Sequence, residues 1–297
     1  MRVSAILGRA ALIGAGAVAA QAALSAARRA PRADELKRTN FHGRTVTLAG
    51  GPALAAAATV TSAAGAGSPA LAGAALLAGG VSGAVGLYDD IVGTRPDQKA
   101  SKGFRGHLSA LKSGTVTSGM VKIVGVGAAA FGAAVLAEAD KPARSRFGRA
   151  LNVLLGTGVI AGTANLVNLL DLRPGRALKA GVVASVPLLA GPSGGLMAGP
   201  VGAGAALLPD DLGEEIMLGD TGANSLGALI GLAAVRRTGP WGRAALLSGL
   251  VALTAASEKV SFTKAIESTP GLRELDALGR RTDHVDDSAN PPAPFLG

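Results

Sequence analysis

The sequence contains no cysteine, which excludes disulfides, thiolate metal ligands and a cysteine nucleophile. Charged residues make up only 16% of the 297-residue chain, well below the roughly 25% of soluble domains. The net charge is +9, but the basic residues are scattered over loops and aromatic residues reach only 3%, so we predict no binding to nucleic acid. The low charge content predicts a membrane protein.

Apolar residues are abundant and form blocks of roughly 15 to 25 residues, the length that crosses a bilayer. We therefore predict an all-α fold, a polytopic membrane helix bundle of about nine transmembrane helices. The predicted spans are residues 3–27, 46–65, 69–90, 114–137, 148–170, 179–193, 195–208, 222–236 and 241–258. The sixth and seventh can also be read as one broken helix. Residues 1–262 then form the polytopic domain, and residues 263–297 a cytoplasmic tail with a disordered end.

The distribution of basic residues predicts the orientation. The first segment has features of a signal peptide, but more basic residues follow it than precede it, which favours a retained span with the N-terminus outside. With nine crossings, the C-terminal tail and the loops on its side together carry about twice as many Lys and Arg residues as the N-terminus and the opposite loops. We predict a multi-pass protein of the cell (cytoplasmic) membrane with a cytoplasmic tail.

Four aspartates fall at the predicted cytoplasmic ends of helices. They are Asp89 and Asp90 in "GLYDDIVG", Asp171 in "NLVNLLDLRPG" and Asp220 in "MLGDTGANSLG". Helix ends are where a charge costs least, so one such aspartate would need no function. Four on one membrane face, with amide and hydroxyl neighbours, predict an active site at the cytoplasmic face that binds Mg²⁺, or alternatively Mn²⁺, together with substrate phosphates.

Basic residues on the same side predict an anionic partner. Lys122 lies inside the fourth predicted span, where an unpaired cation is costly, so we expect it to pair with the aspartates or with a phosphate. The loop residues that could attract a lipid headgroup or a phosphorylated donor are Arg38, Arg44, Arg95, Lys99, Lys102, Arg105 and Lys112. Ordinary positive-inside bias explains most of these loop residues equally well.

The order of these motifs resembles the polyprenyl-phosphate N-acetylhexosamine-1-phosphate transferases, relatives of phospho-N-acetylmuramoyl-pentapeptide transferase. "KRTNFHGRTVTLAGG" is similar to the first-loop segment of the family, "GLYDDIVG" to its paired-Asp motif, "NLVNLLD" to its Asn-rich segment and "MLGDTGANSLG" to its Gly-Asp-Thr-Gly motif. The resemblance implies catalytic roles for Asp89, Asp90 and Asp171, and metal ligation by Asp220 and Asp171. The substrate-binding residues that we predict with it are Asn165, Asn168, Lys122, Arg44 and Thr221.

Three departures from that family pattern stand out. Pro174 occupies the position of a second Asp, the last loop has no His cluster, and the chain ends after nine predicted spans where ten are common. If the chain is active, an arginine has taken over the donor diphosphate, and the candidates are Arg173, Arg176, Arg273 and Arg280.

The resemblance implies magnesium-dependent transfer of a sugar-1-phosphate from a UDP-sugar to a polyprenyl phosphate, with release of UMP, in cell-envelope glycan synthesis. An alternative is a catalytically degenerate member that binds lipid phosphate or envelope enzymes, favoured by Pro174. A transporter is disfavoured because the ionisable residues cluster at one face instead of mid-membrane. The predicted partners are the two substrates and membrane lipids, and a homodimer is left open.

Overall fold

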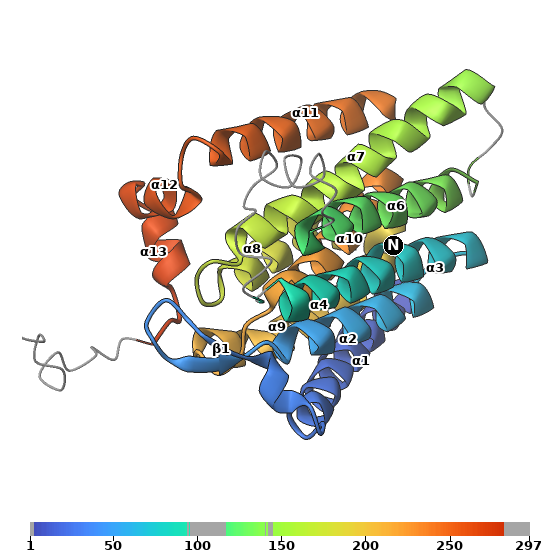
Figure 1. Cartoon of the computed structure of the whole chain (residues 1–297). Coiled ribbons are helices and arrows are strands. Elements are labelled where there is room, and N and C mark those ends of the chain that lie inside the picture. Colours follow the sequence, from blue (N-terminus) through green and yellow to red (C-terminus); the bar gives the residue numbers. More distant parts are fainter. Residues whose placement is uncertain (1–2, 94, 96–116, 140, 142–144, 282–297) are drawn as a thin grey trace, which may run out of the picture.

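The computed structural model describes residues 3–93, 95, 117–139, 141 and 145–281. In this part of the chain it shows a bundle of helices with one short β-hairpin at one end (Figure 1). Lys99, Lys102, Arg105, Lys112 and the predicted disordered end of the tail lie outside the described residues. The all-α prediction is confirmed.

The N-terminal half contains a long first helix, the hairpin and a series of packed helices. Its elements are α1 (Val3–Arg28), η1 (Ala33–Leu36), β1 (Lys37–Thr39), β2 (Thr45–Thr47), α2 (Gly50–Ala64), α3 (Pro69–Ala75), η2 (Leu76–Val81), α4 (Ser82–Val92) and α6 (Ser118–Ala139). The π-helical segment η2 joins α3 to α4 without a break. Ser68 begins this continuous helix, because its side chain accepts a hydrogen bond from the Leu71 amide at 3.2 Å and Pro69 follows it.

The C-terminal half ends in two short helices that fold back on the bundle. Its elements are α7 (Arg146–Leu170), α8 (Arg176–Ser185), η4 (Val186–Leu189), η5 (Gly191–Ser193), α9 (Gly194–Leu212), α10 (Gly219–Arg237), α11 (Pro240–Ser257), α12 (Phe262–Ser268) and α13 (Leu272–Ala277). The chain bends by 94° between α11 and α12. The helices α12 and α13 therefore lie at the same end of the bundle as β1 (Figure 1).

Four helical segments of the described chain are long and apolar enough to cross a membrane, and α11 with α12 would be a fifth if the bent pair is one span. The four are Val3–Arg28, Pro69–Val92, Ser118–Ala139 and Arg146–Leu170. The other predicted spans also fall largely on helices, but α2 has 15 residues and α8 has 10, and α9 and α10, with 19 residues each, are not among the candidate spans. The structure thus supports a membrane protein with four or five candidate spans, and nine spans are not confirmed.

The helix α10 forms the centre of the bundle. Nearly every residue from Thr221 to Val235 is buried, and α10 packs against α2, α4 and α7. Its "GALIG" motif lies against α7: a Cβ at Gly227 would be 2.6 Å from the Cα of Ala164, and one at Gly231 would be 2.7 Å from the Cα of Ile160. The two glycines therefore let the backbones of α10 and α7 approach closely. This central position brings the first turn of α10 against the last turn of α4.

The hairpin is fastened to the segment that leads into α10. Thr47 in β2 donates to the carbonyl of Glu215 at 3.2 Å, and its own carbonyl accepts from Met217 at 2.8 Å. The first loop is therefore held beside the start of α10.

Candidate functional site

Lys122 joins two aspartates that are distant in sequence. Its Nζ lies 2.7 Å from Oδ2 of Asp89, in the last turn of α4, and 2.6 Å from Oδ2 of Asp220, in the first turn of α10. All three side chains are largely buried, so the ion pairs are shielded from solvent. Three helices thus contribute one positive and two negative groups to a single point.

Asp90 has a different environment from its neighbour. Its carboxylate accepts hydrogen bonds from the amide of Asp220 at 3.0 Å, the amide of Thr221 at 2.9 Å and the hydroxyl of Thr221 at 2.6 Å. The residue preceding α10 supplies no capping side chain, so Asp90 caps this helix from α4. A carboxylate at the positive end of a helix is also electrostatically favourable. Asp90 therefore organises the site through contacts that already occupy both its oxygens.

Two glycines allow α4 and α10 to meet in this way. Gly219 has a φ of +59°, a left-handed conformation, and a Cβ there would be 2.8 Å from Oδ1 of Asp90. A Cβ at Gly86 would collide with the carbonyl of Asp220. The "GD" pair at the start of α10 and the glycine three residues before Asp89 are therefore steric requirements of the aspartate cluster.

Asp171 follows the last residue of α7 and faces the same cluster. It lies close enough to Asp211, Asp90 and Asp220 for their negative charges to act on it. Asp211, which the sequence analysis did not select, is 2% exposed and accepts from the amide of Gly175 at 3.1 Å. The sequence feature that could have identified Asp211 is the acidic run "PDDLGEE". The cluster therefore carries an excess of negative charge among the described residues.

The two asparagines of the "NLVNLLD" segment point differently. Asn165 is exposed and donates to the hydroxyl of Thr254 in α11 at 3.2 Å, so it connects α7 to α11. Asn168 is half-buried one turn later, and its carbonyl accepts from the amide of Asp171. Asn168 is therefore placed nearer to the aspartates than Asn165.

A second polar group surrounds Glu214, whose side chain is 3% exposed and whose φ is +57°. The ring of His42 lies 2.9 Å from its Oε1, Asn40 donates to its Oε2 at 2.5 Å, and Arg44 lies 3.9 Å away. Arg44 is thus a hairpin residue that faces Glu214. Neither Glu214 nor the "NFH" run was selected from the sequence as part of a site.

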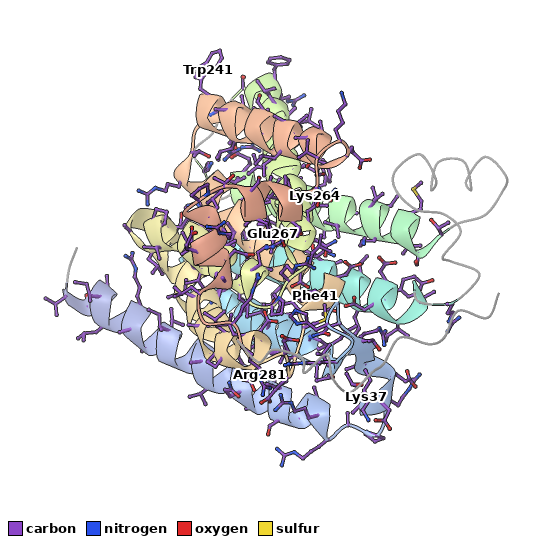
Figure 2. All side chains as sticks on the ribbon, turned by 90° about the vertical axis from the view of Figure 1, so that its left-hand side faces the viewer. Lys37, Phe41, Trp241, Lys264, Glu267 and Arg281 are labelled. Atoms are coloured by element: carbon purple, nitrogen blue, oxygen red, sulfur yellow. The ribbon has the colours of Figure 1, made fainter. Side chains whose placement is uncertain are left out.

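The hairpin turn also contacts the segment after Asp171. The guanidinium of Arg173 lies over the ring of Phe41, 4.0 Å from its centroid. Both residues line a small cavity of about 40 Å³, whose walls also include Asp171, Asp211 and Glu214. The first loop and the "DLRPG" turn are therefore neighbours beside the aspartate cluster, and Phe41 lies on the end of the bundle that faces the viewer in Figure 2.

Arg176 and Arg280 meet on an aspartate of the C-terminal segment. Arg176 donates to both carboxylate oxygens of Asp276 at 2.8 Å, and Arg280 lies 2.8 Å from the same carboxylate. Burial raises the pKa of Asp276, but the hydrogen bond from Arg176 and the charges of both arginines outweigh burial and hold the pKa below its usual range. Arg280 also donates to the carbonyl of Pro174 at 3.0 Å. This part of the predicted tail is therefore packed against the turn that carries Asp171.

Arg273, the remaining arginine predicted to bind the donor, is exposed and pairs with its neighbour Glu274 at 2.7 Å. It makes no described contact with the aspartate cluster. Arg176 and Arg280 are both engaged by Asp276. A role for any of the three at the donor diphosphate therefore remains a prediction, and for Arg176 and Arg280 it would require a second arrangement of the tail.

No protein-family model, no curated protein and no solved structure matches this chain. The resemblance noted from the motifs remains an expectation.

Mg²⁺ is the metal ion predicted for these carboxylates. In the described part of the chain, no group of three or more His, Asp or Glu side chains is placed to hold a metal ion. Mg²⁺ commonly uses only one or two protein carboxylates and completes its shell with water and substrate phosphates. The surplus of carboxylates around Asp171 and Asp220 suits such an ion. The carboxylate of Asp220 could rotate toward the ion if Lys122 remained paired with Asp89. The donor set fits magnesium on these terms.

Proposed function

We propose that this protein transfers a sugar-1-phosphate from a UDP-sugar to a polyprenyl phosphate at the cytoplasmic face of the cell membrane. The observation that carries the proposal is the convergence of Asp89, Lys122 and Asp220 at one end of an apolar helix bundle. An ammonium and several carboxylates at the membrane surface suit a reaction between two phosphorylated substrates, one of them a lipid. The proposal includes nine crossings, with α2, α8 with η4, α9 and α10 spanning in addition to the candidate spans.

In this reaction one P–O bond forms and one P–O bond breaks. A phosphate oxygen of the polyprenyl phosphate attacks the phosphorus that carries the sugar, and the bond from that phosphorus to the bridging oxygen of the diphosphate breaks. The products are a polyprenyl-diphosphate-sugar and UMP. Such a transfer depends mainly on positioning and on charge stabilisation, because little covalent chemistry is left for the protein.

The residues take distinct parts in this proposal. Asp220 and Asp171 would hold Mg²⁺, which when bound supplies positive charge to the phosphate oxygens. Lys122 releases Asp220 and places its ammonium against a phosphate oxygen, while Asp89 keeps Lys122 oriented. Asp90 and Thr221 keep the first turn of α10 in place. Each part is a positioning or electrostatic role, and none needs a proton transfer.

A second candidate is a non-catalytic binder of lipid phosphate. The observation that favours it is Arg280, which donates to the carbonyl of Pro174 where the family pattern has an acid, while Arg176 and Arg280 are already neutralised by Asp276. In that case the phosphate of the lipid would be the only ligand of the cluster.

The experiment is an assay of UMP release by purified protein with polyprenyl phosphate and a panel of UDP-sugars, with and without magnesium. We expect release that requires magnesium and is lost in Asp220→Asn. Asp34→Asn is the matched control, because Asp34 is exposed and, among the described residues, forms an ion pair with Lys37 alone, within the first loop. No release from the native protein with any donor, combined with retained binding of polyprenyl phosphate, would support the non-catalytic binder.

A further inference from the structure

A groove lies between α6 and α7 at the end of the bundle opposite to the aspartate cluster. Its volume is about 450 Å³, and its walls are formed on α6 by Phe131, Val135 and Ala139 and on α7 by Ala150, Val153 and Leu154. Phe131 is 49% and Leu154 is 63% exposed, so the groove opens to the outside of the bundle. The stretch from Phe131 to Ala139 covers about 12 Å along the helix. The groove therefore has the length and the apolar walls to receive part of an acyl chain.

Two arginines close one end of the groove. Arg146 and Arg149 complete its lining, and both are exposed in the first turn of α7, which contains no acidic residue. Two cations one turn apart repel each other, and both oppose the positive end of the helix dipole. Glu138, the described acid at the end of α6, is engaged by Lys141 at 2.9 Å and by Arg243 at 2.7 Å. The arrangement of charges favours an anion from outside the described chain.

The position of the groove matches the boundary of a membrane. Both walls belong to candidate spans, so the groove faces lipid. Phe147 is 80% exposed beside the arginines, and Trp241 at the start of α11 is 89% exposed. The starts of α7 and α11 lie at the same end of the bundle (Figure 1). Exposed aromatic rings of this kind are typical of the level of lipid headgroups. The apolar part of the groove therefore lies on the hydrocarbon side of the two arginines.

We propose that this groove is a binding site for one anionic phospholipid, on the membrane face opposite to the aspartate cluster. An acyl chain lies along Val135, Ala150 and Leu154, and the phosphate lies between Arg146 and Arg149. A headgroup with net negative charge is preferred to a zwitterionic one, because a headgroup ammonium would repel the two guanidiniums. This proposal is independent of the proposed transferase activity.

The test is native mass spectrometry of the full-length protein in detergent, with phosphatidylglycerol or phosphatidylcholine of identical acyl chains. We expect the native protein to retain one phosphatidylglycerol in preference to phosphatidylcholine. In Arg146→Ala/Arg149→Ala, affinity for phosphatidylglycerol should fall about tenfold or more and the preference should disappear. In Ala150→Leu, which narrows the groove and keeps both charges, affinity for both lipids should fall.

Arg29→Ala/Arg32→Ala is the matched control, because it removes two exposed arginines at the other end of the bundle. It should keep the native preference. Helix content and the unfolding midpoint of each variant show whether it is folded, and Arg149→Lys provides a milder substitution. Equal affinity of the native protein for the two lipids, or an unchanged preference in the folded double variant, would overturn the proposal.

Discussion

Arg176 and Asp276, 100 residues apart in sequence, form a buried two-point salt bridge with both N···O distances at 2.8 Å. Arg176 begins α8, directly after the "DLRPG" turn, and Asp276 lies in α13. Lys179 in α8 adds a hydrogen bond to the carbonyl of Leu275 at 2.9 Å. The C-terminal segment is thereby attached to the turn that follows Asp171, and the first two predictions concern this attachment.

Breaking this salt bridge should release the C-terminal helices. In Asp276→Asn or Arg176→Met, we expect α12 and α13 to become sensitive to limited proteolysis, because removing one partner of a buried pair costs about 3–5 kcal/mol. Glu274→Gln is the control, since its pair with Arg273 is exposed and should matter little. Native resistance in both single variants would contradict this role.

Acid should release the same segment. The pKa of Asp276 lies below its usual range in the folded protein, so its ionised form contributes stability above the unfolded value of about 3.9, and that contribution is lost as the pH falls through the folded value. The attachment should therefore persist at pH 5 and weaken below about pH 4. A fluorophore on a cysteine placed at the exposed Ser268, unique because the chain has no cysteine, would report the release as a fall in anisotropy. Asp276→Asn should show a low anisotropy that does not change with pH in this range.

The adjacent residues Asp89 and Asp90 should respond differently to the same substitution. Asp90→Asn should lower the free energy of unfolding by about 1–2 kcal/mol, because an amide cannot accept all three hydrogen bonds from Asp220 and Thr221. Asp89→Asn should leave stability closer to native, since Lys122 keeps Asp220, and should abolish turnover if the proposed reaction occurs. Thermal unfolding and UMP release measured on both variants distinguish the two roles. Equal destabilisation by the two substitutions would contradict the assignment of Asp90 as the cap of α10.

The predicted orientation can be tested with single cysteines. Lys37 and Lys264 are exposed at the end of the bundle that carries the aspartates (Figure 2), and Ser145 is exposed at the other end. Cysteines at the first two positions should be protected from an impermeant thiol reagent in intact cells, and one at Ser145 should be labelled. Labelling of cysteines at positions 37 and 264 from outside the cell would show that the orientation is the opposite of the predicted one.

Sequence reasoning located the aspartate cluster better than its partners. Alternating spans place Asp89, Asp171 and Asp220 on one face, and the cost of an unpaired cation in a helix predicts an anionic partner for Lys122. In the structure, Asp89, Asp171, Asp220 and Lys122 all lie at one end of the bundle. The contacts of Glu214 and Arg176 could not be predicted, because they depend on how the hairpin and α13 fold back onto the bundle. The sequence also could not show that α10 is the buried centre of the bundle, because that burial depends on how α2, α4 and α7 pack around it.

The cap that Asp90 places on α10 has a consequence for biogenesis. The two partners are 130 residues apart, so at the usual rate of translation Asp90 is made on the order of ten seconds before the amides that it will bind. Lys122 emerges much earlier and can neutralise Asp89 while the C-terminal half is still on the ribosome. The first turn of α10 can therefore be capped only after most of the chain has been made, and in a chain that stalls before Gly219 the carboxylate of Asp90 lacks the amides that it binds in the folded protein.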